Sequence, residues 1–234
     1  MWSRWAVPLL LLLSFRGCVA YEYEHEFWLR VDGSGTVYVT GRPDLWAAFK
    51  GLPQSDDPEA LKRSARALFE ESGLRVRRVT VTHRGGRPYL FVSADFTDVN
   101  RLPSAPAFPD LRIVLRAQDD RLRLEGVWQP PSSPAARAAA ADGLLAVRFH
   151  LPSKVYAHDN AYEGVERGNI VSWRETVAEG LAARPRGFGV LIDRRSILLS
   201  TVGIFAAAIA VALAFLAAAL YLVLRRGRRT TAPG

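Results

Sequence analysis

Apolar and polar side chains alternate along much of the chain between residues 21 and 195, which is the period-2 pattern of strands with one buried face. The segment Tyr21 to Phe27 places aromatic rings and a histidine between glutamates. Turn-forming residues follow at 32–35, and the β-branched segment Thr36 to Thr40 comes next. This pattern predicts a β-hairpin at the start of the region.

The same reasoning predicts one main helix in a setting of hairpins. Asp57 is a capping residue, Pro58 suits the first turn, an apolar stripe follows at helical spacing, and Gly73 closes the segment. We therefore expect a helix over about 57–72. The remaining elements are expected as short helices at 43–50 and 135–142, an ordered loop at 102–109, and strands at 74–83, 89–96, 111–117, 121–128, 144–151, 170–174 and 188–192. The predicted fold class is α+β, with antiparallel hairpins, one main helix and short helices.

A long apolar stretch lies near the C-terminus. Ile197 to Leu224 is 28 residues without a charge, proline, asparagine or glutamine. As a helix it is about 42 Å long, against a hydrocarbon core of about 30 Å. A helix inside a soluble core is seldom this long and apolar on every face. The stretch therefore predicts a single transmembrane helix at 196–224, followed by a basic tail at 225–234.

The N-terminus has the features of a secretory signal peptide at 1–20. Arg4 supplies the positive charge, and the apolar run from Ala6 to Phe15 is too short to span a bilayer. Cleavage before Tyr21 is one expected route. Lipidation of Cys18 is the other and the one we slightly favour, although Arg16 departs from the usual lipobox pattern.

The flanks of the long apolar stretch predict how the chain is oriented. Four arginines at 225–229 follow it and two at 194–195 precede it, so the positive-inside rule places the tail in the cytoplasm. The signal peptide independently places 21–195, the α+β domain, outside. We expect a single-pass protein of the cytoplasmic membrane with most of the chain extracytoplasmic.

Composition and charge exclude several classes of protein. The net charge is +8, but six arginines belong to the two ends, leaving a net +2 for 21–195, which gives little support for nucleic-acid binding. One cysteine excludes a cysteine-rich metal centre, and four histidines remain as candidate metal ligands or bases at neutral pH. We expect no cofactor, no metal and no nucleic-acid partner. No Gly-x-Ser-x-Gly, His-Glu-x-x-His or phosphate-loop motif is present, and no catalytic residue is assigned.

Two polar patterns remain as candidates for function. Arg112, Arg116, Arg121 and Arg123 alternate with aliphatic residues, which places arginines on one face of a sheet. That face is either simply solvated or a patch for anionic headgroups or polymers. The segment His158 to Asn169 is dense in polar residues, but adjacent His158 and Asp159 point apart if the chain is extended there. An active site would need a turn that brings them together.

The same segment carries a resemblance. Leu151-Pro152-Ser153-Lys154-Val155, then His158-Asp159-Asn160, Gly164 and Gly168-Asn169-Ile170-Val171-Ser172-Trp173, is similar to the bacterial LppM-type lipoprotein domain. Ser153 stands where that family often has glycine. The layout of an exported N-terminus and one C-terminal span is also similar. The resemblance implies an α+β envelope domain with a lipid-binding or trafficking role and carries over no catalytic residue.

The patterns together favour a membrane-anchored envelope protein that acts as a non-catalytic binding module, with a lipid, a glycan or a membrane protein as ligand. An envelope enzyme with a site near His158 to Asn169 is one alternative. The other is an accessory subunit of a membrane complex, in which Ala206, Ala210, Ala214 and Ala218 form a helix-packing face. Alanine is common throughout the chain, so this spacing also has a simpler explanation.

Overall fold

The computed structural model describes residues 21–129, 133–182 and 184–229. The predicted signal peptide at 1–20, Cys18 included, lies outside the described residues, so both remain predictions. The end of the basic tail, 230–234, lies outside them as well.

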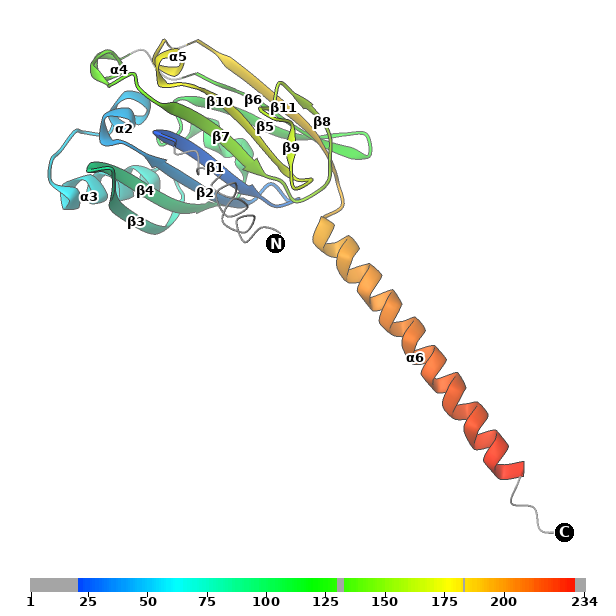
Figure 1. The fold of residues 1–234 in the computed structure, drawn as a ribbon. Coiled ribbons are helices and arrows are strands. Elements are labelled where there is room, and N and C mark those ends of the chain that lie inside the picture. Colours follow the sequence, from blue (N-terminus) through cyan, green and yellow to red (C-terminus); the bar gives the residue numbers. More distant parts are fainter. Residues whose placement is uncertain (1–20, 130–132, 183, 230–234) are drawn as a thin grey trace, which may run out of the picture.

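The described chain is an α+β structure with two β-sheets, several short helices and a long C-terminal helix (Figure 1). Sheet A has the strand order β3-β4-β2-β1-β7-β10-β9, at Arg75–Arg84, Arg87–Phe96, Gly35–Gly41, Tyr23–Leu29, Leu144–His150, Ile170–Thr176 and Val165–Glu166. Sheet B has the order β5-β6-β11-β8, at Leu111–Gln118, Arg121–Trp128, Arg186–Asp193 and Val155–Asp159. The helices are α2 (Pro43–Lys50), α3 (Pro58–Glu71), the 3₁₀ helix η1 (Val99–Ser104), α4 (Pro134–Ala138), α5 (Val177–Leu181) and α6 (Ile197–Arg229).

The period-2 pattern of the first strand sets the inside of the domain. On β1, Tyr23, His25, Phe27 and Leu29 are buried, while the glutamates between them lie on the opposite face. The inner rings meet aromatic side chains of both sheets and of α2: Phe27 stacks on Phe149 at 4.9 Å between centroids, and Tyr23 packs edge-on against Phe49 at 4.8 Å. The core therefore lies between sheet A on one side and sheet B with α2 and α3 on the other.

The predicted hairpins and main helix are confirmed. β1 pairs with β2, β3 with β4, and β5 with β6, all antiparallel. The helix α3 begins where predicted, because the Asp57 side chain accepts a hydrogen bond from the Glu59 amide at 2.9 Å. One pairing departs from the expected antiparallel arrangement: β7 lies parallel to β1, with Tyr23 opposite Leu145.

Three parts of the fold differ from the sequence expectation. The helix expected at 135–142 ends at Ala138, because the backbone of Ala140 bonds to side chains of another element. The loop expected at 102–109 begins as the 3₁₀ helix η1. The strands β8 and β9 and the short helix α5 were not predicted, since each is too short to show a clear period.

The long helix α6 leaves the domain at the end of β11 and extends away from it (Figure 1). Its segment Thr201–Leu222 is long and apolar enough to cross a membrane, and none of it is buried against the domain. Large apolar side chains such as Ile204 and Phe215 are exposed there, which in water would be unfavourable. The finding agrees with the predicted single transmembrane helix.

Candidate functional site

The polar segment from His158 to Asn169 forms the end of β8, a turn region and β9. His158 is the cross-strand neighbour of buried Val190, so its side chain faces the inside of sheet B, whereas Asp159 faces the outside and forms an ion pair with Arg123. The two side chains therefore lie on opposite faces of one strand. Within the described part of the chain, no group of three or more His, Cys, Asp or Glu side chains is placed to hold a metal ion.

The alternating arginines occupy the outer face of sheet B, but most are already paired. Arg116 lies 2.8 Å from Glu125, and Arg123 contacts both Glu125 and Asp159. The Arg112 guanidinium donates to a backbone carbonyl at 3.4 Å. Because neighbouring carboxylates neutralise Arg116 and Arg123, the middle of this face offers little free positive charge to a ligand.

A polar cleft of about 510 Å³ lies where β10, α5 and the start of β11 meet. Figure 1 shows α5 at the edge of the domain, between the end of β10 and the start of β11. Its walls bring together residues of four segments: Asn160, Tyr162, Trp173, Arg174, Glu175, Glu179, Arg184, Pro185, Arg186 and Gly187. Asn160 and Tyr162 come from the segment singled out in the sequence, while the arginines and glutamates of the cleft carried no sequence motif.

Three arginines give the cleft its charge. Arg174 extends over the Tyr162 ring, 4.3 Å from its centroid, which is a cation–π contact. Arg186 binds Glu175 through two nitrogens, at 3.0 and 2.9 Å. Arg184 is exposed at the mouth. The Trp173 indole is buried and donates to the Asp159 carbonyl at 2.7 Å, so it positions the β8 turn and offers no free ring face.

The two carboxylates of the cleft differ in environment. Burial raises the pKa of Glu175, although Arg186 opposes the shift, and its Oε1 is buried without a hydrogen-bond partner among the described residues. Glu179 caps α5, and the hydrogen bond from the Thr176 amide lowers its pKa. The cleft is therefore lined by one carboxylate oxygen, Glu175 Oε1, that has no hydrogen-bond partner among the described residues. Both carboxylates are held in place, Glu175 by Arg186 and Glu179 by the cap of α5.

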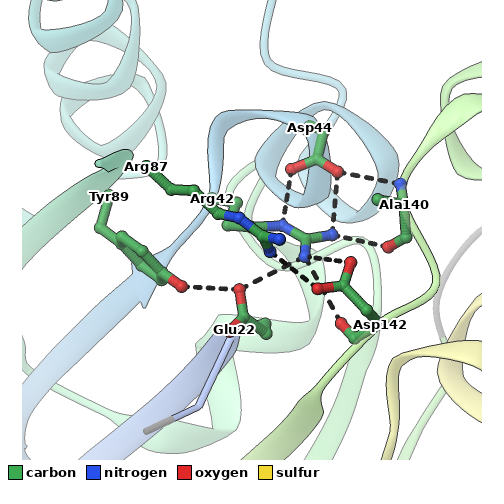
Figure 2. Close-up of polar contacts among 7 residues, drawn as sticks. All are labelled: Glu22, Arg42, Asp44, Arg87, Tyr89, Ala140 and Asp142. Atoms are coloured by element: carbon green, nitrogen blue, oxygen red, sulfur yellow. Dashed lines mark hydrogen bonds and ion pairs between the residues drawn. The ribbon is translucent and has the colours of Figure 1, made fainter. Parts of the chain in front are cut away.

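A second polar cluster surrounds Arg42 (Figure 2). Its guanidinium donates to Asp44 through two bonds of 3.0 Å, and also to Glu22 and Asp142 and to the Ala140 carbonyl. Arg42 is 4 % exposed. With its donors used inside the protein, Arg42 ties β1, α2 and the 140–142 loop together and has none left for a ligand. The partners of Arg42 lie between 2 and 100 residues from it in the sequence, so no local sequence pattern predicted this cluster.

A third cluster is fully buried between the sheets. Lys50 Nζ lies 3.0 Å from Asp110 Oδ1, the Trp128 indole donates to Asp110 Oδ2 at 3.0 Å, and His25 Nε2 lies 3.7 Å from that same oxygen. Lys50 and Asp110 are 5 % and 2 % exposed, and His25 is fully enclosed. The side chains of His25, Lys50 and Asp110 are not exposed to solvent, so the cluster contributes to the stability of the core and does not form a binding site.

Acidification is expected to destabilise the domain through His25. Burial lowers the pKa of His25 to about 3, from 6.5 for a free imidazole. Between these values the unfolded chain binds one more proton than the folded chain, so the free energy of unfolding falls by about 1.4 kcal/mol for each pH unit below 6.5. Urea unfolding of the detergent-solubilised full chain between pH 7 and pH 5 measures this slope. His25→Gln should flatten it, and an equal slope in that variant would contradict the assignment.

No protein-family model and no curated protein matches the chain. Among solved structures, the NMR structure of the folded domain of Mycobacterium tuberculosis LppM aligns with 77% of this chain and 94% of its own length. The TM-score is 0.40 and the sequence identity 13%. This is the family that the sequence resembles. At this level the likeness says nothing of ligand or activity, which must be inferred from the chain's own side chains.

Proposed function

We propose that this chain is a membrane-anchored protein of the bacterial cell envelope that acts by binding, and that the cleft between β10, α5 and β11 holds the ligand. The observation that carries the proposal is the gathering of Arg174, Arg184 and Arg186 in that cleft. Guanidiniums are suited to anions because each presents several donors in a fixed plane. Two nitrogens of Arg186 bind Glu175 and one nitrogen of Arg174 lies 3.5 Å from Glu166, so the exposed Arg184 and the remaining donors of the other two arginines are the groups offered to a ligand. The apolar helix α6 supplies the anchor.

The chemistry of the cleft favours one class of ligand, an acidic saccharide, either free or as the headgroup of a glycolipid. Asn160 and Tyr162 add hydrogen-bonding groups beside the guanidiniums, and the Tyr162 side chain is 44% exposed. The lining side chains are mostly charged or polar, so they suit hydroxyl and acid groups better than acyl chains. Arginine binds carboxylate and phosphate groups bidentately.

The proposed role is non-catalytic. A hydrolytic site needs an acid or base that can reach the reacting atoms. Glu175 is bound by Arg186 and Glu179 by the cap of α5, while His158 faces the interior of sheet B. These arrangements support binding, because both carboxylates among the described residues of the cleft are held by neighbours.

Reversing the charge of Arg184 should weaken binding of acidic oligosaccharides by about fivefold. Arg184 is exposed, so Arg184→Glu is expected to fold normally. The experiment measures calorimetric binding of acidic and matched neutral oligosaccharides to the full-length chain in detergent, at low and high salt.

Arg101→Glu is the matched control, because Arg101 is an exposed arginine on η1 outside the cleft. The control should bind as the unchanged chain does. Equal loss in both variants would mean a general charge effect and would contradict the cleft as the site. No binding of any acidic oligosaccharide by the unchanged chain would contradict the ligand class.

A further inference from the structure

Basic side chains from three separate segments meet at the end of sheet B where the chain enters α6. The Asp193 amide at the end of β11 donates to the Lys154 carbonyl at 3.1 Å, and Asp193 is also the cross-strand neighbour of Arg121. Arg194 and Arg195 follow directly, and α6 begins at Ile197. Figure 1 shows β8 and β11 at the end of the domain from which α6 leaves.

An exposed tyrosine organises this group. The Arg121 guanidinium lies 3.9 Å from the centroid of the Tyr156 ring, and Lys154 Nζ lies 5.4 Å from it. The Tyr156 hydroxyl donates to Asp193 at 3.2 Å, and its side chain is 44% exposed. We call Arg121, Lys154, Tyr156, Arg194 and Arg195 the collar. Tyrosine and arginine are the residues that membrane interfaces favour.

Acidic neighbours reduce the charge of the collar without cancelling it. Asp193 accepts hydrogen bonds from the Arg195 amide and the Tyr156 hydroxyl, and the first of these helps to lower its pKa. Asp120 lies 3.8 Å from Arg121, and Asp119 forms the hairpin tip, where its carbonyl accepts from Arg194 at 3.5 Å. The four cationic groups thus have two carboxylates, those of Asp120 and Asp193, among their contacts.

The distance between the collar and the apolar segment of α6 determines how far the collar lies from the hydrocarbon core of a membrane. The apolar segment Thr201–Leu222 rises about 33 Å as a helix, which fills the hydrocarbon core. Ile197, the first residue of α6, precedes Thr201 by four residues, which is about 6 Å along the helix. The headgroup region extends about 5–8 Å beyond the hydrocarbon on each side. The start of α6 therefore lies in the headgroup region when Thr201–Leu222 spans, and the collar adjoins it through Arg194, Arg195 and the contacts of Asp193.

We propose that the collar docks on anionic lipid headgroups and holds the domain in one orientation on the membrane surface. The inference rests on α6 spanning a membrane and is independent of the ligand of the cleft. Basic side chains near an anionic bilayer are attracted to it, and the attraction is screened by salt. The stacked Arg121–Tyr156–Lys154 unit presents two of these charges in a fixed geometry.

Hydrogen exchange of the full-length chain in lipid nanodiscs tests the docking. The probe lipids are pure phosphatidylcholine and a mixture with one-third phosphatidylglycerol. We expect amides of residues 117–123 and 154–157 to exchange about three- to tenfold more slowly in the anionic discs. Raising the salt to 0.5 M should remove the difference, and this measurement needs no substitution.

The double variant Arg121→Ser/Lys154→Ser should lose the slowing, while Arg101→Ser/Arg137→Ser, which replaces two exposed arginines elsewhere, should keep it. Equal exchange in both kinds of disc, or slowing that survives high salt, would overturn the proposal. Slowing that persists in the collar variant would overturn it as well.

Discussion

Replacing Asp110 by asparagine is expected to lower the free energy of unfolding by about 3–5 kcal/mol. Asparagine has nearly the same shape and still offers an oxygen to the Trp128 indole. The substitution removes the anion that Lys50 contacts at 3.0 Å, and the Lys50 ammonium is buried, so water does not replace that contact. An unpaired buried ammonium carries most of the penalty. Urea unfolding of the full chain in detergent, followed by near-ultraviolet circular dichroism, measures the loss.

A second substitution separates the lost ion pair from lost packing. Lys50→Met removes the orphaned charge and keeps a long apolar side chain beside Phe108, over which Lys50 Nζ lies at 4.6 Å. The double variant Lys50→Met/Asp110→Asn should therefore be more stable than Asp110→Asn alone. If the double variant were the less stable of the two, buried charge would not explain the cost.

The buried cluster has a consequence for the pH dependence of the domain. Burial alone would raise the pKa of Asp110, but the Lys50 ammonium beside it and the hydrogen bond from the Trp128 indole hold it below its usual value. The carboxylate therefore stabilises the fold above the pKa of an unfolded aspartate and loses this contribution as the pH falls through its folded pKa. His25 acts in the same direction at higher pH, because it is buried in its neutral form.

Local patterns predicted the elements that form from neighbouring residues. The alternation of β1, the capping Asp57 of α3 and the turns of the three hairpins all depend on spacings of a few residues, which a sequence displays directly. The parallel pairing of β1 with β7 joins residues more than 100 positions apart. Such pairings depend on how whole elements pack, so no local pattern reveals them.

The candidate site was predictable only in part, for the same reason. The segment from His158 contributes Asn160 and Tyr162 to the cleft. Arg184, Arg186 and Glu175 join them because α5 returns the chain toward the start of β11. The arginine face of sheet B was predicted correctly in position, but its ion pairs with Glu125 and Asp159 depend on cross-strand and tertiary contacts.

Two arginines at the centre of α6 should detach the chain from the membrane. Arginine at a helix centre opposes insertion by about 2.5–3.5 kcal/mol, and each large apolar residue favours it by about 0.3–0.6 kcal/mol. Val211 and Phe215 lie near the middle of Thr201–Leu222, a segment with ten Leu, Ile, Val or Phe residues. Val211→Arg/Phe215→Arg thus costs about 5–7 kcal/mol, which exceeds the favourable contribution of the aliphatic and phenyl side chains that remain.

Alkaline carbonate extraction of membranes from cells that express the full chain measures this effect. All chains carry Cys18→Ser, so that the expected lipid anchor is absent. The otherwise unchanged chain and the control Val211→Leu/Phe215→Leu should stay in the membrane pellet, and the double-arginine variant should move to the supernatant or be degraded. Extraction of the unchanged chain would mean that α6 does not span, because peripheral proteins wash off under these conditions whereas an inserted helix is held by its buried apolar surface. Retention of the double-arginine variant would place the anchor elsewhere in the chain, and the collar would then lose its fixed distance from the bilayer.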